Sequence, residues 1–155
     1  MPLATILWVD DEMESLQSQK LFLETKGYAV FTLTNGFDAI EFVKDNYVDV
    51  VLIDETMPGI TGLETLAKIK EINQQVPVVL ITKNETENLM DDAIGSQISD
   101  YLIKPVNPNQ VLLSLKKILD NRRLVAEKTT FAYQQQFRNL FMALNSNPDY
   151  NEWMD

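Results

Sequence analysis

Cysteine and histidine are both absent from the 155 residues. Without cysteine the chain can form neither a disulfide nor a thiolate metal site. Without histidine it has no Ser-His catalytic pair and no internal phosphohistidine. Basic residues are also few, with 13 Lys and Arg against 23 Asp and Glu and a net charge of -10. We therefore expect cations or basic protein surfaces as partners, and no nucleic acid in this region.

Long apolar runs are missing too, and the amino terminus lacks the basic start of a signal peptide. We therefore expect a cytoplasmic protein with no membrane partner. The hydrophobic fraction of 45% over this length supplies one full domain and little more.

Short apolar runs alternate with helical patterns along most of the chain. The strands expected from these runs are residues 4–9, 28–33, 48–54, 78–82 and 100–103. Helices are expected at 13–26, after Gly36, after Gly62, at 84–95 and at about 107–123. Five strand-helix pairs with short connections predict a doubly wound α/β domain with a mostly or wholly parallel sheet.

Carboxylates follow two of these strands. Asp10 and Asp11 come after the first, and Asp54 ends the third. In open α/β sheets the carboxyl edge of the strands is where ligands bind. If the two strands are neighbours, like charges there repel by about 4 kcal/mol per pair at an effective dielectric near 20. The cluster therefore predicts a cation or a bound proton, although each acid alone could be a turn former or a helix cap.

Further polar groups follow the fourth and fifth strands, namely Thr82 and the pair Lys104-Pro105. Residues of these types, supplied in this order by four loops, resemble the receiver domain of two-component response regulators over about residues 3–121. The resemblance implies a five-stranded sheet of order 2-1-3-4-5. It also implies that a sensor histidine kinase transfers a phosphoryl group to Asp54.

The resemblance further implies a role for each group at this edge. Asp11, Asp54 and the backbone carbonyl of Thr56 would ligate Mg²⁺, and Asp10 would act largely through water. Mn²⁺ or Ca²⁺ would be substitutes. Lys104 and Thr82 would contact the phosphoryl group, Tyr101 would be the switch aromatic, and the Lys104–Pro105 bond would be cis.

The pattern changes beyond Arg123. An amphipathic helix with a wide apolar stripe is expected there, formed by Tyr133, Phe137, Leu140, Phe141 and Leu144. The stripe must pack back on the receiver, against a second subunit, or against a following domain. We expect a receiver domain at 3–121 and a helical extension at 122–155 that begins a truncated helical bundle.

A subtype is indicated by the sequence DYLIKPVNPNQ at 100–110 together with LSLKK at 113–117. These two stretches of sequence resemble the PorX-type regulators of type IX secretion. In these regulators a helical bundle and a metal-dependent, phosphatase-like PglZ-type domain follow the receiver.

The leading interpretation is a phosphorylation switch. We expect no enzymatic activity other than, at most, self-dephosphorylation. The switch would alter the face formed by residues 84–121 and so control downstream domains or a homodimer. A Mg²⁺-dependent phosphohydrolase is a second interpretation, but the haloacid-dehalogenase type needs an aspartate where Thr56 stands. A third is a phosphorylation-independent interaction module in which Lys83 blocks the site.

Overall fold

The computed structural model describes residues 2–83 and 97–145, and for 123–130 and 144–145 the backbone alone. The chain divides into two compact units, Met1–Lys116 and Lys117–Asp155. Each unit is described by itself.

The first unit is built around a parallel sheet. Its strands are β1 Thr5–Val9, β2 Ala29–Leu33, β3 Val50–Asp54, β4 Val78–Thr82 and β5 Asp100–Ile103. They form a five-stranded sheet of order β2-β1-β3-β4-β5 in which every pairing is parallel. The doubly wound architecture and its strand order are therefore confirmed.

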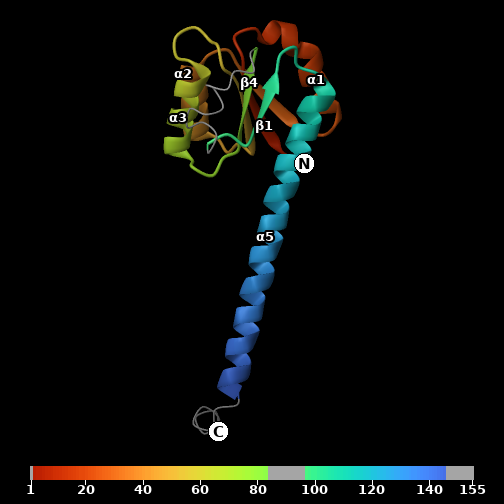
Figure 1. The fold of residues 1–155 in the computed structure, drawn as a ribbon, viewed down its shortest axis with the longest axis vertical. Helices are drawn as coiled ribbons and strands as arrows, with labels where there is room; N and C mark the ends of the chain where they lie inside the picture. Colours follow the sequence, from red (N-terminus) through yellow and green to blue (C-terminus); the bar gives the residue numbers. More distant parts are fainter. Residues whose placement is uncertain (1, 84–96, 146–155) are drawn as a thin grey trace. The chain divides into compact units, whose positions relative to one another are not determined.

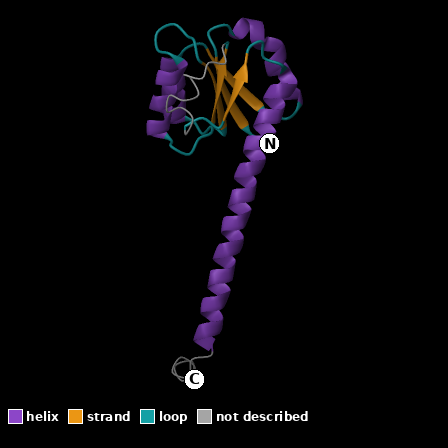
Figure 2. Ribbon diagram, viewed as in Figure 1, coloured by secondary structure: helices purple, strands orange, loops and turns teal. Residues whose placement is uncertain are grey.

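Helices cover both faces of this sheet. They are the 3₁₀ helix η1 Met13–Leu16, α1 Gln17–Thr25, α2 Gly36–Asp45, α3 Gly62–Ile72 and α5 Pro108–Asn145. Figures 1 and 2 show α2 and α3 on one face, with α1 and the first turns of α5 on the other. The helix expected at 84–95 lies outside the described residues.

The central strands are apolar because both of their faces are covered. Every residue of β3 and of β4 is buried. One core cluster joins this sheet to α2 and α3 through Leu7, Val9, Ala39, Val51, Ile53, Leu66 and Ile69, among others. A polar side chain at a strand end is therefore held on a rigid frame, facing the loops and not the core.

Local signals start the two helices next to the carboxyl edge. The Asn35 side chain accepts a hydrogen bond from the Asp38 N–H and caps α2. Thr61 and Glu64 form a capping box at the start of α3.

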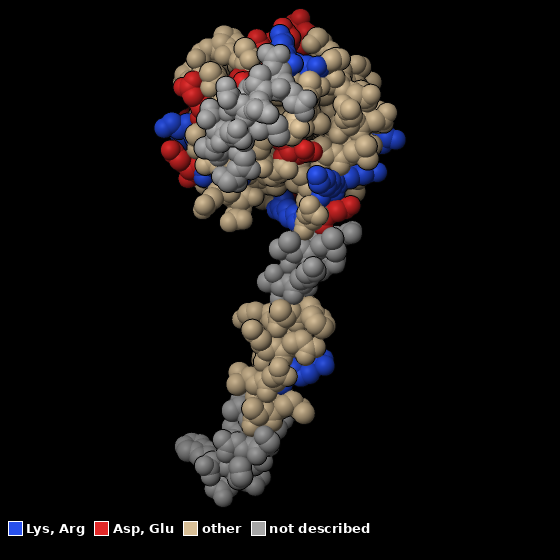
Figure 3. Space-filling view, in the orientation of Figure 1, with Lys and Arg blue, Asp and Glu red and all other residues tan. Residues whose placement is uncertain are grey.

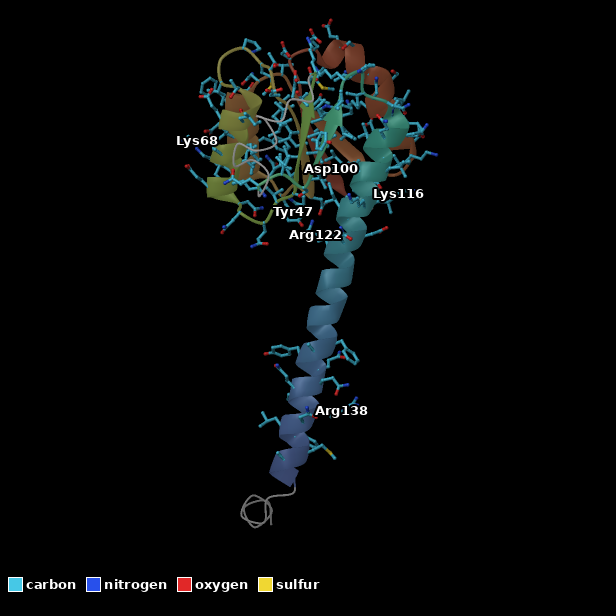
Figure 4. The ribbon with its side chains drawn as sticks, viewed as in Figure 1. Tyr47, Lys68, Asp100, Lys116, Arg122 and Arg138 are labelled. Carbon is cyan, nitrogen blue, oxygen red and sulfur yellow. The ribbon has the colours of Figure 1, made fainter. Side chains whose placement is uncertain are left out.

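Gly27, at φ 104°, follows α1 in the left-handed region that favours glycine. Asp100 begins β5 and marks the opposite, amino-terminal edge of the sheet (Figure 4).

The second unit consists, where described, of the continuation of α5. The sequence predicts one helix ending near Arg123 and another after it, but α5 is continuous over 38 residues. No glycine or proline occurs between Asn109 and Asn145 to interrupt it. Large apolar side chains are exposed along it, namely Phe131, Tyr133, Phe137, Leu140, Phe141 and Met142. In Figure 3 the described side chains of this unit are mainly tan, the colour of uncharged residues.

No helix among the described residues has the length and apolar character needed to cross a membrane.

Candidate functional site

Three carboxylates meet at the carboxyl edge of the sheet. β1 and β3 are neighbours, and the pairing of Val9 with Ile53 places the next residues, Asp10 and Asp54, side by side. One ligand oxygen from each of Asp10, Asp11 and Asp54 lies within 4.8 Å of the others. Asp10 and Asp54 are buried, at 0% and 3% exposure, whereas Asp11 is exposed. The structure thus brings together the three acids that the sequence analysis singled out.

One ammonium group is shared by the two buried acids. Lys104 Nζ lies 3.2 Å from Asp10 Oδ2 and 3.2 Å from Asp54 Oδ2. Its position follows from β5, because the Lys104 N–H donates to the Thr82 carbonyl and extends the β4–β5 ladder by one residue. The Lys104–Pro105 peptide bond is cis, as expected.

The contact of Lys104 with Asp10 and Asp54 does not neutralise the negative charge of the site. Burial, followed by the neighbouring charge of Asp10, raises the pKa of Asp54 from 3.8 to about 6, although Lys104 and the Thr56 N–H act in the opposite direction. Burial lowers the pKa of Lys104, but the charges of Asp10 and Asp54 outweigh it, and the net pKa is raised. The carboxylates therefore carry excess negative charge around one retained ammonium.

The donor set fits a hard divalent cation. Asp10 Oδ1 accepts a hydrogen bond from the Glu12 N–H, and Asp54 Oδ1 accepts one from the Thr56 N–H. Asp10 Oδ2 is buried, and among the described residues it has the ion-pair contact with Lys104 but no hydrogen bond. Mg²⁺ and Ca²⁺ prefer such carboxylate oxygens. The described protein groups do not fully satisfy the oxygens of the three acids. These oxygens are therefore available to bind an ion.

The hydroxyl at the end of β4 has a partner that the sequence analysis missed. Thr82 is buried, with 4% exposure, and its Oγ1 donates a hydrogen bond of 2.6 Å to Glu55 Oε2. The pairing of Asp54 with Ile81 could have revealed this contact, because it puts the following residues, Glu55 and Thr82, opposite each other. Tyr101 on β5 is half-buried, and the side chain of Lys83 is exposed.

The loop after β3 is fixed by backbone contacts. The Glu55 N–H donates to the Ile81 carbonyl at 2.8 Å, and the Gly62 N–H donates to the Glu55 carbonyl at 2.9 Å. A Cβ at Gly62 would overlap the Asp54 carbonyl oxygen and come within 2.8 Å of Glu55 Cα. The first residue of α3 is therefore packed closely against the backbone of Asp54 and Glu55.

Two family models match the chain. Residues 6–116 match the response regulator receiver domain, and residues 123–155 match the PorX response regulator linker domain.

Curated relatives match most of this chain. The chain is 32% identical over 130 residues to the phosphoglycerate transport system transcriptional regulatory protein PgtA of Salmonella typhimurium, covering 84% of this chain and 31% of that protein. It is 34% identical over 132 residues to the transcriptional regulatory protein ZraR of Klebsiella oxytoca, covering 85% and 30%. The chain thus spans about a third of the length of these relatives.

Solved structures show the same fold. A CheY-like response regulator receiver domain protein of Methanospirillum hungatei superimposes with a TM-score of 0.73 at 26% identity, covering 78% of this chain and 97% of that one. The response regulator protein TrrA of Thermotoga maritima, solved in complex with Mg(2+)-BeF, gives a TM-score of 0.67 at 28% identity, covering 75% and 99%.

Proposed function

Because this chain belongs to the response regulator receiver domain family, we propose that Asp54 accepts a phosphoryl group from a sensor histidine kinase in a Mg²⁺-dependent reaction. The observation that carries the proposal is the cluster of Asp10, Asp11 and Asp54 around the ammonium of Lys104. The phosphoryl donor would be a histidine of a separate kinase, since these 155 residues contain none.

The step itself makes one bond and breaks another. An oxygen of the Asp54 carboxylate bonds to phosphorus, and the bond between phosphorus and the imidazole nitrogen of the kinase breaks. That nitrogen keeps the electron pair, and solvent supplies its proton, so the product is an aspartyl phosphate. Lys104, already 3.2 Å from Asp54 Oδ2, is placed to hold a phosphoryl oxygen by charge. Thr82 would donate its hydroxyl to another phosphoryl oxygen.

The acids and one backbone group would hold the ion. We assign Asp11, Asp54 and the Thr56 carbonyl as direct ligands of Mg²⁺, with Mn²⁺ or Ca²⁺ as substitutes, and Asp10 as a ligand through water. The bound ion would supply positive charge that offsets repulsion between the carboxylates and the incoming phosphoryl group. Excess negative charge and the raised pKa of Asp54 support this assignment.

The consequence of phosphorylation would be a shift between two conformations of the face formed by residues 84–121, with Tyr101 turning inward. Part of that face lies outside the described residues. Through it the receiver would control downstream domains or a homodimer. The match to the PorX linker domain supports a role in type IX secretion and a PglZ-type domain further along the chain. The domain boundary expected after residue 121 also stays a prediction.

Beryllofluoride, which mimics an aspartyl phosphate, tests the proposal. With Mg²⁺ and beryllofluoride the full chain should show bound fluoride by ¹⁹F NMR, and Asp54→Asn should show none. The control is Asp38→Asn, a change in an exposed acid in the first turn of α2. This variant should bind beryllofluoride as the wild type does. Equal binding by wild type and Asp54→Asn would refute Asp54 as the acceptor.

A further inference from the structure

One resting partner of Thr82 is the carboxylate of Glu55. The hydrogen bond between Thr82 Oγ1 and Glu55 Oε2 is 2.6 Å long, within the short range of bonds to an ionised acceptor. Thr82 is almost fully buried, and Glu55 is half-buried. This contact therefore lies in a partly dry environment, where such a bond is stronger than at the surface.

The sheet register imposes this contact. Asp54 pairs with Ile81, and the Glu55 N–H donates to the Ile81 carbonyl, so the β3–β4 ladder extends one residue past the strand end. Glu55 and Thr82 are therefore cross-strand neighbours whose side chains lie on the same face. The Gly62 N–H bond to the Glu55 carbonyl holds the backbone of Glu55 in that place.

Glu55 is next to the acidic cluster but is not part of it. Among the described residues the group able to hold a metal consists of Asp10, Asp11 and Asp54. One Glu55 oxygen instead accepts a hydrogen bond from the Thr82 hydroxyl. A threonine hydroxyl has a single proton to donate. It therefore cannot donate a hydrogen bond to Glu55 and to a phosphoryl oxygen on Asp54 at the same time.

We propose that Glu55 is a positioning residue that competes with the phosphoryl group for the Thr82 hydroxyl and so opposes the switched state. The proposal rests on the phosphoacceptor function proposed above. In the resting chain the Thr82 hydroxyl donates to Glu55. Phosphorylation must break that bond before Thr82 can donate to the phosphoryl group, and the free energy lost reduces the gain from phosphorylation.

The test compares Glu55→Ala in two backgrounds. The full chain is titrated with beryllofluoride at saturating Mg²⁺, and ¹⁹F NMR gives the apparent dissociation constant. With Thr82 present, Glu55→Ala should tighten binding about three- to tenfold, where tenfold corresponds to about 1.4 kcal/mol. In the Thr82→Val background, which keeps the shape of the side chain but removes the hydroxyl, the same change should alter binding by less than about twofold.

Two further variants separate the competing explanations. Glu55→Gln retains an acceptor oxygen without the charge, so it should tighten binding less than Glu55→Ala. It also serves if the alanine variant does not fold. Glu14→Ala removes a negative charge from an exposed residue of η1 and should leave the dissociation constant unchanged.

A readout independent of beryllofluoride is the ¹³C–¹H signal of the Thr82 methyl group. In the absence of Mg²⁺ it should move in Glu55→Ala and stay in place in Glu14→Ala.

Equal tightening with Thr82 present and in the Thr82→Val background would show that Glu55 acts only by charge repulsion and would overturn the proposal. Unchanged or weaker binding in Glu55→Ala would overturn it as well. Either result, with binding still abolished by Asp54→Asn, leaves the phosphoacceptor function intact. Wild-type chain that binds no beryllofluoride would instead refute the phosphoacceptor function itself.

Discussion

Lys104 and Asp54, 50 residues apart in the chain, meet at the carboxyl edge of the sheet with Nζ 3.2 Å from Oδ2. The same ammonium lies 3.2 Å from Asp10 Oδ2. Among the described residues, Lys104 is therefore the positive charge that forms ion pairs with both buried carboxylates. It both stabilises the cluster and competes with any cation that binds there.

Replacing Lys104 with methionine should therefore change two quantities in opposite directions. The free energy of unfolding in EDTA should fall by about 1–3 kcal/mol, because two carboxylates lose their counter-charge. The affinity for Mg²⁺ should rise, because a like charge next to the ion is removed. Chemical denaturation and calorimetric titration measure the two quantities.

A matched control is Lys68→Met. Lys68 and its partner Glu71 are both well exposed and 3.8 Å apart, so we expect a change below about 0.5 kcal/mol and the same Mg²⁺ affinity. Weaker Mg²⁺ binding by the Lys104 variant would contradict competition between the ammonium and the cation.

The raised pKa of Asp54 predicts that the metal-free chain gains stability when this acid is neutralised. The pKa is about 6 in the folded chain against 3.8 for an ordinary aspartate, so the folded state binds the proton more tightly. Stability contributed by this group is therefore present at low pH and is lost as the pH rises from about 4 to about 6. Asp54→Asn should be more stable than wild type by about 1–3 kcal/mol at pH 7.5, and the gain should shrink toward pH 4.

Chemical denaturation in EDTA at several pH values measures this difference. Asp10 still pairs with Lys104 in the variant, so the ammonium keeps one partner. A difference that does not vary with pH would show that ionisation of Asp54 is not its cause.

Protons should compete with the divalent cation for the same carboxylate. Because Asp54 must lose its proton to bind a metal ion, Mg²⁺ affinity should be constant above about pH 7. Below the Asp54 pKa of about 6 it should fall up to about tenfold per pH unit. Asp11→Asn should lower the affinity at every pH without moving this midpoint. Titration calorimetry measures both, and an affinity that stays flat down to pH 5 would exclude Asp54 as a ligand.

The strands and the carboxyl edge can be predicted from sequence because their signals are local. β4 and β5 begin and end at the residues expected from the sequence. For β4 the reason is that a continuous apolar run has few other ways to be buried. Once β1 and β3 are neighbours in a parallel sheet, Asp10 and Asp54 must lie at the same edge.

Other features depend on information that a local pattern does not contain. A change in the apolar pattern near Arg123 predicts a break, but backbone hydrogen bonding continues when the buried face of a helix changes, so α5 runs on to Asn145. The Glu55–Thr82 bond depends on the register of two strands far apart in sequence. The roles of the site residues in phosphorylation stay predictions for the experiments above.

The last prediction concerns the glycine at the start of α3. Gly62→Ala would place a methyl group against the Asp54 carbonyl oxygen and within 2.8 Å of Glu55 Cα, both backbone atoms that cannot move without shifting the end of β3. We expect the variant to lose about 2 kcal/mol or more of unfolding free energy. We also expect weaker Mg²⁺ binding, because the displaced backbone carries Asp54.

The control is Gly59→Ala. There the loss of stability comes from a φ of 88°, and the new Cβ would approach only the Phe37 ring, at 3.4 Å. That variant should be destabilised by about 1 kcal/mol yet bind Mg²⁺ normally. Equal losses of Mg²⁺ affinity in the two variants would show that the contact of Gly62 with the Asp54 backbone does not position the site.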